Sequence, residues 1–324
     1  MLTADCSMPD VFFECVLFLA GLAFGSFLNV CITRIPRDES VVRPPSHCRG
    51  CGKPIRWFDN IPLLSYVLLH GRCRTCGARI SLRYPAVELL TGLLWVACFA
   101  MYGPTWLTLK FCVFSFLLVG LIFMDAETGL LVHEFTYPGI VLGLAFAWIA
   151  PWDSSAARFL LLVFQRSMVG ARWVSLLDSA LAALAGAGFF FLAWALYYLM
   201  RKRHGLGFGD IALMAMSGAF LGLKLTAFVI ACAPILTLGW AIVLLVWGAT
   251  HPTRSVPVAA GFHGRANAEP SRLSEGNSLE TDDAVSGEQP FLQREVPFGV
   301  FLGICSLAAI FVGEAAWKWY LGRF

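Results

Sequence analysis

The chain has 324 residues, of which 58% are hydrophobic and only 14% are charged. Its mean hydropathy of +0.71 excludes a soluble globular enzyme, in which about 25% of residues are charged, and predicts a protein that crosses a membrane several times. The net charge of +3 forms no basic stripe of the kind that binds nucleic acid, so we expect no nucleic-acid partner.

Apolar runs long enough for a helix of about 20 residues recur along the chain. They predict an all-α polytopic bundle of about eight transmembrane helices embedded in the lipid bilayer. The first run has no cationic segment before it and no small-residue cleavage site after it, so we expect a retained helix and not a signal peptide. The expected spans are 11–33, 86–102, 106–125, 134–150, 176–199, 209–223, 225–249 and 297–320.

The segment 34–83 follows the first span and predicts the orientation of the chain. It holds ten lysine and arginine residues against Asp38, Glu39 and Asp59. Because basic loops stay in the cytoplasm, we expect this segment on the cytoplasmic side. Counting spans from there places Asp125 and Asp210 near that same side. A later segment, 250–295, is rich in small and polar residues, and we expect a flexible cytoplasmic loop.

Four of the eleven cysteines form two Cys-x-x-Cys pairs, Cys48 with Cys51 and Cys73 with Cys76. Two such pairs supply the four thiolates of a tetrahedral structural Zn²⁺ site. All four ligands come from the protein, so the metal organises the loop and leaves no open position for water or substrate. Two disulfides or a redox role fit the same spacing, although a cytoplasmic loop disfavours disulfides.

Two carboxylates lie at the ends of apolar runs, where acidic residues are costly and point to function. Asp125 ends the run 107–124, and Asp210 closes a glycine-rich segment at the start of another span. If the bundle brings them together, they share one proton and can act as the pair of an aspartyl hydrolase. A helix cap or a solvated boundary residue is the alternative for each. Glu88 is either an interfacial residue or part of a pocket.

Several motifs occur in order along the chain, at 24–36, 45–48, 54–62, 71–81, 83–92, 207–210 and 296–301. Together they closely resemble the bacterial type IV prepilin peptidases, membrane aspartyl proteases with a Gly-x-Gly-Asp box. The likeness runs from about residue 11 to 313, apart from 150–175 and 250–295.

The resemblance implies an endopeptidase that removes the basic leader of type IV prepilins or pseudopilins at the cytoplasmic face of the bacterial inner membrane, for pilus assembly or type II secretion. It places Asp125 and Asp210 at the two catalytic positions. Members with the tetracysteine loop also N-methylate the new terminus with S-adenosylmethionine, for which no binding residue can be assigned. The implied segments are a first transmembrane helix (1–33), a zinc loop associated with methyl transfer (34–84), the peptidase core (85–249), the flexible loop (250–295) and a last helix (296–324).

The chain departs from the family pattern near both aspartates. Val132-His133 stands where Pro-Asp or Pro-Asn is usual, and Ala212 stands where lysine is usual. Two other functions therefore stay open. One is a proton- or ion-coupled transporter that uses the two aspartates, and the other is a non-catalytic assembly protein of a pilus or secretion system.

Overall fold

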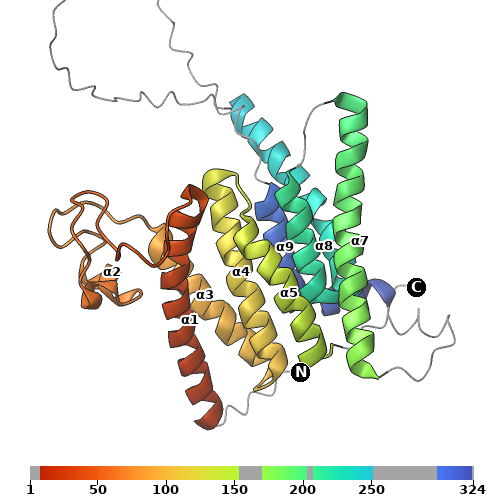
Figure 1. The fold of residues 1–324 in the computed structure, drawn as a ribbon, viewed down its shortest axis with the longest axis horizontal. Helices are drawn as coiled ribbons and strands as arrows, with labels where there is room; N and C mark the ends of the chain where they lie inside the picture. The colour runs from red at the N-terminus through yellow and green to blue at the C-terminus, as the bar shows by residue number, and fades with distance from the viewer. Residues whose placement is uncertain (1–7, 153–169, 203–206, 251–297, 323–324) are drawn as a thin grey trace, which may run out of the picture. The chain divides into compact units, whose positions relative to one another are not determined.

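The computed structural model describes residues 8–152, 170–202, 207–250 and 298–322, and this described part is mostly helical. Its only extended pairings are two isolated bridges, His47 with Pro54 and Arg72 with Arg79. The predicted all-α polytopic fold is confirmed (Figure 1). The helices are α1 (Met8–Arg34), η1 (Ile35–Arg37), η2 (Trp57–Asn60), α2 (Leu64–Leu68), α3 (Arg83–Tyr102), α4 (Trp106–Thr128), α5 (His133–Ile149), α7 (Ala171–Arg201), α8 (Phe208–Thr250) and α9 (Phe298–Leu321).

Six described helices, α1, α3, α4, α7, α8 and α9, are long and apolar enough to cross a membrane. The helix α5 has 17 residues and is shorter than the usual span of about 20. The two predicted spans 209–223 and 225–249 both lie in α8, and α7 begins five residues before the predicted start at 176. The predicted loop 250–295 lies outside the described residues except for Thr250.

Within α8, the helix is interrupted at Gly222, where the predicted spans meet. Gly222 has φ 75° and ψ 172°, a conformation open to glycine but costly for other residues. The side chain of Asp178 in α7 fills the space beside it, and its Oδ2 accepts a hydrogen bond from the N–H of Leu223 at 3.3 Å. The second part of α8 thus begins on a carboxylate supplied by a neighbouring helix.

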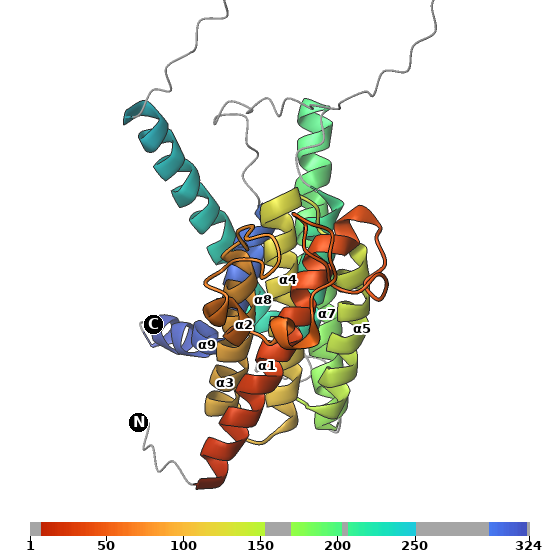
Figure 2. The ribbon, with the colours of Figure 1, turned by 90° about the vertical axis from the view of Figure 1, so that its left-hand side faces the viewer.

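The chain forms two compact units, one comprising Met1–Thr237 with Pro297–Phe324 and the other Leu238–Val296. In the first unit, α4 contacts α1, α3, α5 and α9. Its Phe114 stacks on Phe220 of α8 with ring centroids 4.6 Å apart. Ser217 of α8 hydrogen-bonds to Ser306 of α9 at 3.0 Å. These contacts pack the early part of α8 against both α4 and α9, within the helix bundle shown from two sides in Figures 1 and 2.

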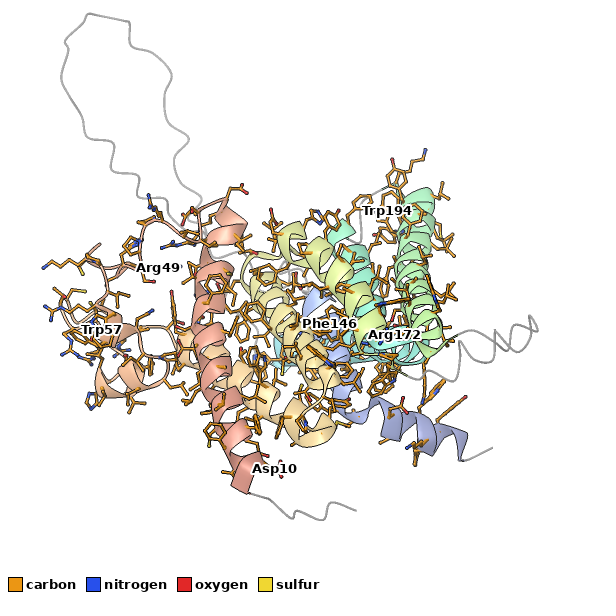
Figure 3. The ribbon with its side chains drawn as sticks, turned by 60° about the horizontal axis from the view of Figure 1, so that its bottom comes forward. Asp10, Arg49, Trp57, Phe146, Arg172 and Trp194 are labelled. Carbon is orange, nitrogen blue, oxygen red and sulfur yellow. The ribbon has the colours of Figure 1, made fainter. Side chains whose placement is uncertain are left out.

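The segment between α1 and α3 carries the four paired cysteines and projects from the helices, with Arg49 and Trp57 pointing outward (Figure 3). Glu88 of α3 anchors it. This buried side chain accepts a hydrogen bond from the backbone N–H of Leu63 at 2.9 Å. Glu88 thus ties the loop to the helices. This role differs from both interpretations from sequence, an interfacial residue or part of a pocket.

Candidate functional site

Asp125 lies in the last turn of α4 and is buried, with 6% of its surface exposed. Its Oδ2 accepts a hydrogen bond from the N–H of Val300 at 2.9 Å, in the first turn of α9. The neighbouring Gly299 comes so close that an added Cβ would lie 2.8 Å from the same oxygen. The first N–H groups of a helix have no partner within the helix and carry partial positive charge. The start of α9 therefore holds one carboxylate oxygen of Asp125 in a fixed position.

Asp210 is the third residue of α8 and is also buried, with 8% of its surface exposed. Its backbone N–H donates to the carbonyl of Gly207 at 3.2 Å, which closes the turn that begins the helix. The residue before Asp210 packs against Leu131, which also lies beside the first turn of α9 that holds Asp125. The structure therefore brings the two predicted aspartates to one site, from the end of α4 and the start of α8.

Leu131, in the turn between α4 and α5, fills the space between the helix starts that surround the aspartates. An added Cβ on Gly209 would lie 2.5 Å from the Cβ of Leu131, and one on Gly299 would lie 2.8 Å from its Cδ1. Three segments far apart in the sequence thus meet on one leucine, with Asp125 and Asp210 beside the contact. Only residues without a Cβ allow this approach.

We expect Gly209→Ala to impair the site because its new methyl group would overlap Leu131. Overpacking of this kind costs about 1–3 kcal/mol. The melting temperature of the purified protein should fall. Any activity that depends on Asp210 should fall with it. Gly188→Ala in α7 is the matched control, because nothing lies within 4 Å of a Cβ added there. Equal melting temperatures and activities for Gly209→Ala and the control would contradict the close packing.

Arg83 links the end of α4 to the N-terminal part of the chain. Its guanidinium forms an ion pair with Glu127, two residues after Asp125, and donates to the hydroxyl of Thr33 in α1 at 3.0 Å. The side chains of Arg83 and Glu127 are 11% and 41% exposed, so water screens the pair and its role is to orient the end of α4 more than to stabilise it. The turn of α4 that carries Asp125 is thereby connected to both α1 and α3.

The four paired cysteines form one cluster. The sulfur atoms of Cys48, Cys51, Cys73 and Cys76 all lie within 4.8 Å of one another. The Sγ atoms of Cys48 and Cys76, which belong to different pairs, are 3.7 Å apart. Thiolates about 2.3 Å from a tetrahedral metal ion are separated by about 3.8 Å. The cluster can therefore hold a metal ion.

The loop around the cluster is built by two similar turns. Cys48 N–H donates to the carbonyl of Lys53, and Cys73 N–H donates to that of Ala78. Hydrogen bonds from the N–H groups of Cys76 and Thr75 and from the Cys48 thiol lower the pKa of Cys73 to about 6. Desolvation and the neighbouring cysteines raise the pKa of Cys76 to about 11, so the cluster without metal favours one thiolate, and binding a metal would deprotonate the others.

A bidentate ion pair ties the second cysteine turn to η2. Arg74 donates to both oxygens of Asp59, with a shortest distance of 2.6 Å. This hydrogen bonding and the charge of Arg74 hold the pKa of the Asp59 carboxyl below its usual value. Because the pair is at the surface, its role is to orient the turn more than to stabilise it.

Several contacts of the site could not be found by reasoning from sequence. The motif 296–301 is recognisable in the sequence, but the hydrogen bond from its Val300 N–H to Asp125 is not. Leu131 and the Arg83–Glu127 pair gave no signal, since each depends on residues far apart in the chain.

Two segments of the chain match known protein families. Residues 19–102 match the bacterial peptidase A24 N-terminal domain, and residues 111–242 match the type IV leader peptidase family. Three similar proteins are each named prepilin leader peptidase/N-methyltransferase. That of Myxococcus xanthus (strain DK1622) is 41% identical over 66% of this chain and 59% of its own. Those of Neisseria gonorrhoeae and Aeromonas hydrophila are 34% and 30% identical, over 76% and 98% of this chain and 88% and 96% of theirs.

No solved structure matches the chain. The fold and the site define a polytopic membrane protein with two buried aspartates at neighbouring helix ends and a separate four-cysteine cluster. The chain belongs to the type IV leader peptidase family.

Proposed function

We propose that this protein is a membrane aspartyl endopeptidase that removes the basic leader of type IV prepilins or pseudopilins and then N-methylates the new N-terminal residue. The observation that carries the proposal is that Asp125 and Asp210 are buried beside the same contact at Leu131, inside the segment that matches the type IV leader peptidase family. The names of the relatives supply both activities.

In the proposed mechanism the two aspartates share one proton, because neighbouring carboxylates do not both ionise easily. Asp125, whose Oδ2 accepts the N–H of Val300, takes a proton from the attacking water. Asp210 carries the shared proton and donates a hydrogen bond to the scissile carbonyl. The water oxygen adds to the carbonyl carbon, and the C–N bond then breaks as the leaving nitrogen gains the proton that Asp125 took from the water. The scissile bond must be in an extended segment, since the carbonyl of a helix is already hydrogen-bonded.

We infer that the four-cysteine cluster holds a structural Zn²⁺ ion, because an all-thiolate tetrahedral donor set is typical of that metal. Bound there, the ion would crosslink the two cysteine turns. Since all four positions are filled by Cys48, Cys51, Cys73 and Cys76, the protein leaves none for a reacting group. The metal therefore supports the loop and takes no part in peptide hydrolysis.

We place the protein in the inner membrane with its aspartates facing the cytoplasm. The basic composition of 34–83 supports this orientation, because positively charged loops remain inside. In that orientation the site faces the compartment that holds a prepilin leader. The transporter alternative is disfavoured, since Asp125 and Asp210 lie at helix ends and coupling sites of transporters lie near the bilayer midplane.

Mass spectrometry of a candidate prepilin co-expressed with the protein tests the proposal. We expect the pilin to lose its leader and to gain the mass of one methyl group on the new N-terminal residue. An uncleaved pilin beside correctly inserted protein would reject the peptidase, and a cleaved but unmethylated pilin would reject the second activity.

A further inference from the structure

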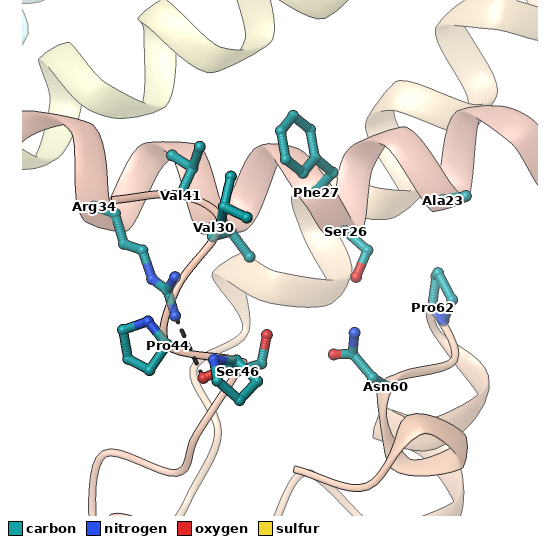
Figure 4. Close-up of a pocket in the computed structure, with 12 residues that line it drawn as sticks. Ala23, Ser26, Phe27, Val30, Arg34, Val41, Pro44, Ser46, Asn60 and Pro62 are labelled. Carbon is teal, nitrogen blue, oxygen red and sulfur yellow. Dashed lines mark hydrogen bonds between the residues drawn. The ribbon is translucent and has the colours of Figure 1, made fainter. Parts of the chain in front are cut away.

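A cavity of about 410 Å³ opens between α1 and the loop that follows it (Figure 4). This volume is in the range of small-molecule sites, about 300–1,000 Å³. Its lining is mixed, with apolar side chains beside hydroxyl, amide and guanidinium groups. The residues that line it include Ser26, Val30, Arg34, Ser46, Asn60 and Pro62.

Arg34 gives the cavity a positive charge. It is buried, with 7% of its surface exposed, and its guanidinium donates to the carbonyls of Ser40 at 2.9 Å and Pro45 at 3.5 Å. Among the residues that the structure describes, no carboxylate forms an ion pair with it. A guanidinium has five N–H donors, and a buried charge without a counter-ion is costly. An anionic group of a ligand would relieve that cost and use the remaining donors.

Two other polar groups, Ser26 and Asn60, lie toward the end of the cavity away from Arg34 (Figure 4). Ser26 points across it toward Asn60 and Pro62, and Ser46 lies between them and Arg34 (Figure 4). Val30 and the proline rings supply apolar walls. The cavity thus suits an elongated ligand with a carboxylate at one end and a hydrogen-bonding, partly apolar group at the other.

The position of the cavity in the chain separates it from the peptidase site. All of its lining lies in the segment that matches the N-terminal domain, 19–102, whereas Asp125 and Asp210 lie in the segment 111–242. Ser46 is two residues before Cys48, and its carbonyl accepts the N–H of Ile55 at 2.8 Å, so the cavity wall continues into the first cysteine turn. The cavity can therefore serve a second activity without using Asp125 or Asp210.

We propose that this cavity binds the methyl donor S-adenosylmethionine, with Arg34 pairing with the methionyl carboxylate and Asn60 and Ser26 facing the nucleoside. The assignment rests on the proposed methylating function. In the transfer, the nitrogen lone pair of the new N-terminal amine attacks the methyl carbon. The electrons of the breaking C–S bond go to sulfur, which leaves neutral S-adenosylhomocysteine, and the amine loses one proton to water.

Calorimetric titration of the purified full-length protein with S-adenosylmethionine, and separately with S-adenosylhomocysteine, tests the site. Loss of a charge-assisted pair costs about 1.5–3 kcal/mol, so Arg34→Gln should weaken Kd for both by roughly 10- to 100-fold. The matched control is Arg37→Gln, an exposed arginine in η1, which should stay within about twofold of wild type. Melting curves show whether each variant is folded.

A second variant avoids the buried charge. Ser46→Trp fills the cavity from the loop side and should also abolish measurable binding. Binding equal to wild type in both Arg34→Gln and Ser46→Trp, with the folds intact, would overturn the cavity assignment while leaving methylation in place. A wild-type protein that binds neither compound and does not methylate a cleaved pilin would overturn the proposed methylation itself.

Discussion

Asp125→Asn and Asp210→Asn should each lower the rate of leader cleavage by roughly 10³-fold or more, because each removes one half of a proton-sharing pair. Asparagine keeps the size of the side chain but can neither take a proton from water nor carry the shared one. The measurement is the cleavage rate of a purified prepilin by each purified variant. Both variants should still insert in the membrane and melt as a single folded protein.

Two comparisons make this result specific to the pair. Glu134→Gln changes an exposed acidic residue in the first turn of α5 and should leave the rate within about twofold of wild type. The double variant Asp125→Asn with Asp210→Asn should be no slower than either single variant, since residues that act as a unit are not additive. Wild-type rates in either single variant would refute the assignment of the pair.

Cys73→Ser should abolish metal binding, and the cysteine loop should become less ordered as a result. Wild-type protein should contain about one zinc per chain, and the variant close to none, because three thiolates hold the ion much more weakly than four. The cavity wall continues into this loop, so we expect methylation to fall more than cleavage does. Elemental analysis of the purified protein gives the zinc content, and mass spectrometry of the pilin gives both activities.

Cys15→Ser is the control for the metal, since Cys15 is exposed on α1 and distant in sequence from the cluster. It should keep full zinc content. Disulfides joining Cys48 to Cys51 and Cys73 to Cys76 in protein isolated without reduction would contradict the metal site. Zinc-free wild-type protein with full methylation would show that the metal has no part in the function.

Much of the fold was predictable because a bilayer imposes strong constraints on sequence. Apolar runs of sufficient length predicted the helices, and the interruption near 224 marked the break at Gly222 within two residues. The start of α7 was harder to place, since the helix begins five residues before the predicted start at 176. Asp178 lies inside the predicted span, and the sequence assigned it no role, whereas in the structure its carboxylate is buried and caps the second part of α8.

The site was predictable only in part, for a physical reason. Asp125 and Asp210 stand out because carboxylates next to apolar runs are costly, and the cysteine pairs stand out by their spacing. The groups that position them do not, because a backbone N–H such as that of Val300 is present in almost every residue. The same holds for Leu131, whose role depends on the packing of Gly209 and Gly299 against it.

Arg34 illustrates the same limit. In sequence it is one of ten basic residues that indicate a cytoplasmic loop, and its place in the motif 24–36 assigns it no role. In the structure it is buried at the wall of a cavity. The sequence therefore uses Arg34 only as evidence for the orientation of the chain, whereas tertiary packing makes it a candidate ligand contact.

The dependence of leader cleavage on pH tests the shared proton of Asp125 and Asp210 most directly. A pair that works only when it holds a single proton loses activity when both groups are protonated and when both are ionised. We predict a bell-shaped profile of kcat/KM for the wild-type protein. A profile with a single limb, or one that stays flat across the stable pH range, would contradict a mechanism in which the two aspartates act together.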